Sequence, residues 1–186
     1  MSYQEQNDLT PARKKSNVTA TISIIVIAGI LLLMAFAFSS LESSGRPQPG
    51  ETAPDFTLTL LDSTEVSLDS LRGKIIVLNF WASWCTSCRQ EAPDIQKVWE
   101  TYQDKNVVFL GVGFQDTETD SRAFIEEFSI TYPNGLDKTG KLGRAYGVTA
   151  VPETFVIDTG GQVAQVYIGP VTENRLAQQL AQMTNH

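Results

Sequence analysis

Residues 75–88 read IIVLNFWASWCTSC, an almost unbroken apolar run that leads directly into two cysteines three positions apart. Such a run of apolar and β-branched residues is typical of a central strand that is covered on both faces. The next stretch, residues 86–102, has the pattern of a helix that is disturbed at Pro93. A Cys-x-x-Cys between a buried strand and a helix is the setting of a redox-active pair. These residues therefore predict an α/β fold whose chemistry lies at the end of the strand.

The rest of the chain supplies further elements for such a fold. Strand patterns occur at 56–60, 66–68, 107–112, 154–157 and 163–167, and the first two and last two of these should pair as hairpins. A helix is expected at 119–128, and another should begin after Thr172 and bury Leu176, Leu180 and Met183. Strands that alternate with helices and then close with a hairpin predict a mixed central sheet with helices on both faces.

The composition limits the classes of function. A chain of 186 residues has room for one compact domain and a tail. Its 21 acidic and 14 basic residues give a net charge of −7. This balance disfavours nucleic-acid binding, which needs a basic face. Two cysteines cannot form the framework of a disulfide-rich scaffold, so their role must be local.

An apolar segment near the N-terminus predicts a membrane anchor. Residues 18–38 carry no charge, and at 1.5 Å rise per residue their length spans a hydrocarbon core of about 30 Å. The basic residues 13–15 precede the segment, so the positive-inside rule places a tail of residues 1–17 in the cytoplasm. A cleaved signal peptide is the alternative, because residues 35–37 (AFA) resemble a cleavage site. A buried core helix is disfavoured because no polar face interrupts the run.

With either an anchor or a cleaved signal peptide, the chain after residue 38 is expected to lie outside the cytoplasm. Residues 39–49 are rich in Ser, Gly and Pro and are expected to form a linker. The folded domain is then expected at 50–186, on the extracytoplasmic side of the cytoplasmic membrane.

The two cysteines should differ in role. Cys85 falls at the predicted helix N-terminus, where unpaired N–H groups and the helix dipole favour a thiolate and can lower a cysteine pKa from about 8.5 toward 7. We expect Cys85, at the exposed end, to be the nucleophile. Cys88, one turn further on, should resolve the mixed disulfide by attacking it. The Cys85–Cys88 disulfide would be the redox group, without a further cofactor.

Other roles for the two cysteines have less support in the sequence. Two cysteines supply half of a structural zinc site, but the chain has no third cysteine and one histidine, His186, at its C-terminus, so no metal is expected. Covalent haem attachment would need histidine where Arg89 stands. A static disulfide is a further alternative, although so small a ring would stabilise the fold weakly.

Three ordered motifs carry a resemblance to a known family. They are APDFTL at 53–58, LNFWASWCTSCRQEAP at 78–93 and GVTAVPETF at 147–155. Over about residues 50–183 the chain resembles the TlpA/ResA/CcmG (DsbE) group of membrane-anchored, thioredoxin-like thiol:disulfide oxidoreductases. The resemblance implies a thioredoxin-like fold with a helical insertion at 119–128. It also implies a reductant of protein disulfides, such as the cysteines of apocytochrome c, that a membrane thiol carrier re-reduces.

The same resemblance implies further site residues. Pro152 matches the family's cis-proline, which binds substrate backbone, the alternative being a trans proline at a strand edge. Glu91 matches an acidic residue that tunes cysteine protonation in some members, and Glu153 matches the glutamate of members with Pro-Glu-Thr. Both are expected to support the pair and tune its pKa, the alternative being solvated charges. Asn79 stands where thioredoxin has a buried aspartate, and asparagine does not titrate. Any internal base must therefore be Glu91 or Glu153.

The two tryptophans of the motif are expected to differ. Trp84 directly precedes Cys85 and should flank a substrate-docking surface, with ordinary packing as the alternative. Trp81, at the end of the strand, is expected in the core.

Rival functions share part of this pattern. Peroxiredoxins, which are thiol peroxidases, also have an APDFTL-like opening and a cysteine after a strand, but they lack a partner cysteine three residues on. A tethered chaperone or a copper-handling protein would use the fold without catalysis, and copper would favour additional His or Met ligands near the pair. The dipeptide Thr86-Ser87 does not reveal the direction of electron flow: the resemblance implies a reductant, whereas a strongly stabilised thiolate would make an oxidant.

Overall fold

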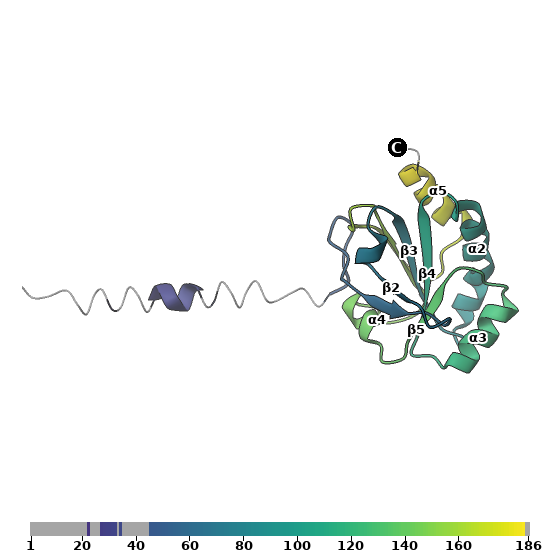
Figure 1. Ribbon diagram of the computed structural model, residues 1–186, viewed down its shortest axis with the longest axis horizontal. Coiled ribbons are helices and arrows are strands. Elements are labelled where there is room, and N and C mark those ends of the chain that lie inside the picture. The colour runs from purple at the N-terminus through teal and green to yellow at the C-terminus, as the bar shows by residue number, and fades with distance from the viewer. Residues whose placement is uncertain (1–21, 23–26, 33, 35–44, 185–186) are drawn as a thin grey trace, which may run out of the picture. The chain divides into compact units, whose positions relative to one another are not determined.

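The computed structural model describes residues 22, 27–32, 34 and 45–184 (Figure 1). The described residues before position 45 are helical. The chain divides into two units, Met1–Glu42 and Ser43–His186. Within the part of the chain that the structure describes, no helix combines the length and the apolar character needed to cross a membrane. Most of the anchor expected at 18–38, and linker residues 39–44, lie outside the described residues. Both expectations therefore stay predictions.

The second unit is built on a mixed sheet of five strands in the order β5-β4-β3-β6-β7. These strands are β3 (Ile75–Trp81), β4 (Val107–Phe114), β5 (Asn134–Asp137), β6 (Glu153–Ile157) and β7 (Val163–Ile168). The central strand β3 pairs in parallel with β4 and antiparallel with β6. The expected mixed sheet is confirmed.

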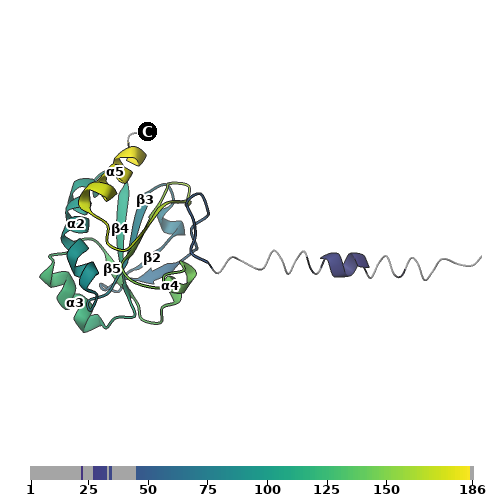
Figure 2. The ribbon, with the colours of Figure 1, turned by 180° about the vertical axis from the view of Figure 1, so that it is seen from behind.

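Helices cover both faces of this sheet, as Figures 1 and 2 show. One face carries α2 (Thr86–Tyr102), α3 (Glu118–Glu127) and α5 (Glu173–Thr184). The other carries α4 (Lys141–Ala145), the 3-10 helix η1 (Asp69–Leu71) and the hairpin of β1 (Thr57–Thr59) and β2 (Glu65–Ser67). Along β3, Val77 packs toward the first group and Leu78 toward the second. A strand buried on both faces explains the continuous apolar run.

Most of the expected elements are present, with small shifts at their ends. The hairpins β1-β2 and β6-β7 are confirmed, and the helix expected at 119–128 is present as α3, between β4 and β5. Helix α2 continues through Pro93, which ends no element. Leu176 and Leu180 are buried as expected, whereas Met183 is only partly buried. Strand β5 and helix α4 were not expected from the sequence.

Candidate active site at the end of strand β3

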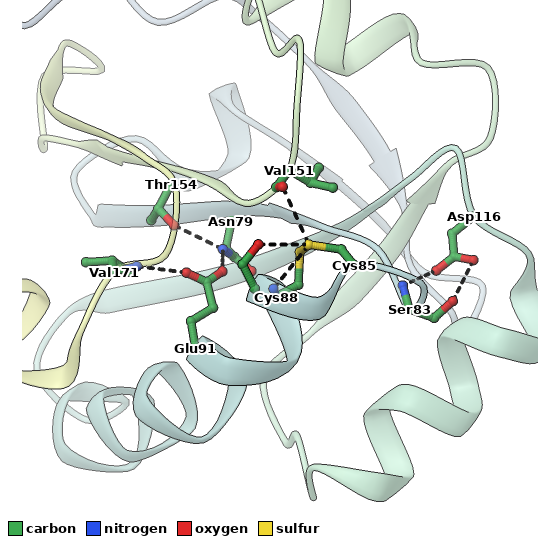
Figure 3. The surroundings of a disulfide bond; sticks show 10 residues. Asn79, Ser83, Cys85, Cys88, Glu91, Asp116, Val151, Thr154 and Val171 are labelled. Carbon is green, nitrogen blue, oxygen red and sulfur yellow. Dashed lines mark hydrogen bonds between the residues drawn. A yellow bond between two sulfur atoms is a disulfide. The ribbon is translucent and has the colours of Figure 1, made fainter.

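The two cysteines form a disulfide at the start of α2, with 5.3 Å between their Cα atoms (Figure 3). Cys85 is the N-cap residue of the helix, and its sulfur accepts a hydrogen bond from the backbone N–H of Cys88 at 3.1 Å. The Ser87 hydroxyl lies 3.4 Å from the same sulfur. Cys85 is 6% exposed and Cys88 1%, so Cys85 is less open than expected but is the more accessible of the two.

The loop before β6 lies against this disulfide. The Val151–Pro152 peptide bond is cis, as the resemblance implied. The carbonyl oxygen of Val151 lies 3.5 Å from the Cys85 sulfur. The residue that precedes Pro152 is thus next to the more accessible sulfur.

Glu91 is a buried carboxylate on the same helix as the disulfide, 3% exposed. Its two oxygens accept hydrogen bonds from the Asn79 side-chain amide and from the backbone N–H of Val171, each at 2.9 Å. The Asn79 amide also donates to the Thr154 hydroxyl at 3.0 Å, and Figure 3 shows these groups pointing toward one another. Burial raises the pKa of Glu91 from 4.5 to about 7, and the two hydrogen bonds offset only part of that effect. A solvated charge at this position is therefore ruled out.

Glu153 is buried too, at 1% exposure, but it lies in a different cluster. Side chains alternate along a strand, so Glu153 and its neighbour Thr154 point to opposite faces of β6. The Glu153 carboxylate accepts two hydrogen bonds from the Arg46 guanidinium, at 2.9 and 2.7 Å. Glu91 and Glu153, the two candidates for an internal base, therefore have different partners in the structure.

The two tryptophans differ as expected. Trp84, next to Cys85, is 64% exposed, so the alternative that it only packs in the core is wrong. Trp81 is 2% exposed and stacks on Phe124 of α3, with 4.3 Å between the ring centroids. An exposed indole therefore borders the disulfide, and a buried one supports the strand beneath it.

Two contributors to the site were not anticipated. Asp116 follows β4, and its carboxylate accepts hydrogen bonds from the backbone N–H and hydroxyl of Ser83, at 2.7 and 3.0 Å, which holds the segment that leads into Cys85. Neighbouring parallel strands such as β3 and β4 end at the same edge of a sheet. The position of Asp116 just after β4 could therefore have predicted that it lies near the end of β3. Arg46 gave a weaker signal as the single basic residue of the expected linker.

The arrangement suits exchange between thiols and disulfides. A sulfur at a helix N-terminus is stabilised as a thiolate by the dipole and by the free N–H groups. A second sulfur one turn away can displace whatever the first sulfur has bound.

Comparisons with known proteins agree with this chemistry. Residues 49–166 match the model of the AhpC/TSA family. Thioredoxin-like protein YneN of Bacillus subtilis (strain 168) is 35% identical over 83% of this chain and 95% of its own length. Thiol-disulfide oxidoreductase ResA of Geobacillus thermodenitrificans is 37% identical over 70% of this chain and 75% of its own.

A solved structure supports the same assignment. A thiol:disulfide interchange protein of the thioredoxin family from Chlorobium tepidum TLS superposes with a TM-score of 0.67 at 29% identity, covering 75% of this chain and 99% of that one. The fold is therefore thioredoxin-like. Together with the disulfide at the start of α2, these similarities show that the chain belongs to the AhpC/TSA family and is a thioredoxin-like thiol-disulfide oxidoreductase related to ResA.

Proposed function

We propose that this oxidoreductase reduces disulfides of other proteins outside the cytoplasmic membrane, with the cysteines of apocytochrome c before haem attachment as its substrate class. The observation that carries the proposal is the buried Glu91, one helical turn from Cys88 with a pKa raised to about 7. Residues three apart on a helix are neighbours, so the ionised Glu91 carboxylate disfavours a negatively charged thiolate on the cysteine pair. A reduced form with less thiolate stabilisation is a stronger reductant, which opposes the effect of the helix dipole on Cys85.

The reaction would proceed by two successive exchanges. The Cys85 thiolate attacks one sulfur of the substrate disulfide, which forms a mixed disulfide and releases the other substrate sulfur as a thiolate. The Cys88 thiolate then attacks the Cys85 sulfur, closes the Cys85–Cys88 disulfide and releases the second substrate thiolate. Two electrons pass to the substrate, whose thiolates take up protons. The hydrogen bond from the Cys88 N–H and the greater exposure of Cys85 favour this order of attack.

The neighbouring groups would divide the remaining tasks. Glu91 takes the proton from the Cys88 thiol, because its pKa near 7 lets it both accept and return a proton at neutral pH. Trp84 and Pro152 would contact the substrate chain on either side of the disulfide. Glu153 would support the site indirectly, because Arg46 occupies its carboxylate.

The cell would have to supply electrons for each turnover. The apolar segment 18–38 with its preceding basic residues supports a single-pass anchor with the N-terminus in the cytoplasm. A membrane thiol carrier would then reduce the Cys85–Cys88 disulfide with electrons from the cytoplasmic side.

Trapping of the mixed disulfide tests the assignment of the cysteines. In the full-length chain, Cys88→Ser should accumulate a covalent complex with an apocytochrome c that carries an intramolecular disulfide, and a reducing agent should release it. Cys85→Ser is the matched control and should trap nothing. Trapping by Cys85→Ser alone would reverse the two roles. Peroxide consumption by the wild-type chain that outpaces disulfide reduction would favour a thiol peroxidase instead.

A further inference from the structure

An ion pair joins two parts of the second unit that lie far apart in the sequence. One partner directly follows the loop of residues 147–152, which lies against the disulfide. Arg46 and Glu153 are 107 positions apart, and the guanidinium donates to both carboxylate oxygens, at 2.9 and 2.7 Å. The Arg46 side chain is 22% exposed and that of Glu153 1%. A third donor, the backbone N–H of Thr149, lies 3.3 Å from the same carboxylate. The Glu153 carboxylate therefore binds both Arg46 and the backbone of the loop at residues 147–152.

The geometry of this pair orients its partners. The planar guanidinium fork binds a carboxylate through two parallel hydrogen bonds, so it sets direction as well as distance. A buried ion pair is weak grounds for stability, because desolvation of both charges opposes their attraction. Loss of one partner, however, leaves the other charge buried and unpaired. Such a pair suits a role in positioning.

The same segment touches the other end of the loop. Gly147 has a φ of +62°, and a Cβ at this position would collide with the backbone of Arg46. Pro47, the next residue, is buried. Arg46 thus contacts the first residue of the loop, Gly147, and Glu153, the residue that directly follows the loop.

This loop carries the groups that face a substrate. Between Gly147 and Glu153 lie Val151, whose carbonyl oxygen is 3.5 Å from the Cys85 sulfur, and Pro152. We propose that Arg46 is a positioning residue that clamps both ends of this loop and so holds its backbone in the orientation that receives an extended polypeptide beside Cys85. The inference rests on the proposed function and adds a selectivity: the clamp matters for protein disulfides, which need the loop backbone, and little for small disulfides.

Steady-state kinetics of the full-length chain in detergent tests this inference. The substrates are insulin and glutathione disulfide, with dithiothreitol as electron donor. Arg46→Gln should raise KM for insulin about tenfold while kcat changes less than about twofold, because the clamp acts on binding. Arg46→Lys keeps the charge but loses the fork, and it should recover part of the increase. The matched control is Arg122→Gln, which removes the exposed Arg122–Glu118 pair of α3 and a hydrogen bond to the Leu61 carbonyl. It should leave KM for both substrates unchanged.

A second variant separates positioning from folding. Arg46→Gln leaves Glu153 buried without its cation, so the single variant can lose stability for that reason alone. The double variant Arg46→Gln/Glu153→Gln removes both charges and should regain thermal stability, but its KM for insulin should stay raised. A wild-type KM for insulin in either folded variant, or an equal loss with glutathione disulfide, would overturn the positioning role. If the wild-type chain reduces neither substrate, the proposed function fails instead.

Discussion

At the scale of single residues, Glu91 makes the stability of the fold depend on pH. Its pKa is raised by burial to about 7 from an ordinary value of 4.5, so the folded chain holds a proton that the unfolded chain releases. Stability contributed by the neutral carboxyl is complete below pH 4.5 and is lost as pH rises through about 7. A pKa shift of this size corresponds to about 3 kcal/mol in the free energy of unfolding.

Replacement of Glu91 by glutamine should remove this dependence. Between about pH 4.5 and 8, the free energy of unfolding of the oxidised wild-type chain should fall by about 3 kcal/mol more than that of Glu91→Gln. Urea unfolding at a series of pH values measures both. Glu126→Gln, at an exposed site on α3, is the matched control and should follow the wild type. Parallel pH profiles for wild type and Glu91→Gln would contradict the buried, titrating carboxyl.

The residues of the site were predictable to different degrees. Cys85 and Cys88 stand out because their motif directly follows an apolar strand. The burial of Glu91 was not predictable from spacing alone, because it depends on the amide of Asn79 and the backbone of Val171, which come from other elements. The partner of Glu153 lies 107 positions away, and only the folded chain brings Arg46 to it.

At the scale of elements, length and periodicity decide which parts could be predicted. Helices α2, α3 and α5 have 10 to 17 residues with an apolar stripe, and β3 and β4 are long apolar runs. Strand β5 has four residues, NGLD, without apolar alternation. It is held by its pairing with β4 and by the hydrogen bond from Trp81 to Asn134. Helix α4 has five residues and contains a glycine, so no helical period could develop.

The turn after α4 provides a test at this scale. Gly147→Ala should destabilise the fold by at least about 2 kcal/mol, because alanine is strained at positive φ and its Cβ would collide with the Arg46 backbone. Gly50→Ala is the matched control: Gly50 also has a positive φ, +93°, but a Cβ there would meet nothing within 4 Å. Its cost should be about 1 kcal/mol. Urea midpoints measure both, and equal costs would show that Arg46 does not pack on Gly147.

At the scale of the whole molecule, the folded unit extends beyond the boundary expected at Gly50. Arg46 and Pro47 belong to the expected linker, yet one neutralises Glu153 and the other is buried. A linker composition rich in Ser, Gly and Pro does not exclude such contacts, because they depend on single side chains.

Truncation at two positions tests this boundary. A chain that begins at Gly45 should keep the stability of the second unit. A chain that begins at Gly50 should be less stable by about 3 kcal/mol, because Glu153 is left buried without its cation. Thermal unfolding compares the two, and Glu153→Gln in the shorter chain should restore much of the loss. Equal stability of the two chains would mean that Arg46 contributes nothing to the folded unit.

The reduction potential of the Cys85–Cys88 couple tests the central claim most directly. Equilibration of the full-length chain in detergent against dithiothreitol buffers, followed by quantification of free thiols, gives the value. A reductant of protein disulfides should have a potential near or below about −270 mV, the thioredoxin range. A potential toward about −120 mV would make the protein a disulfide donor and contradict the proposed direction of electron flow.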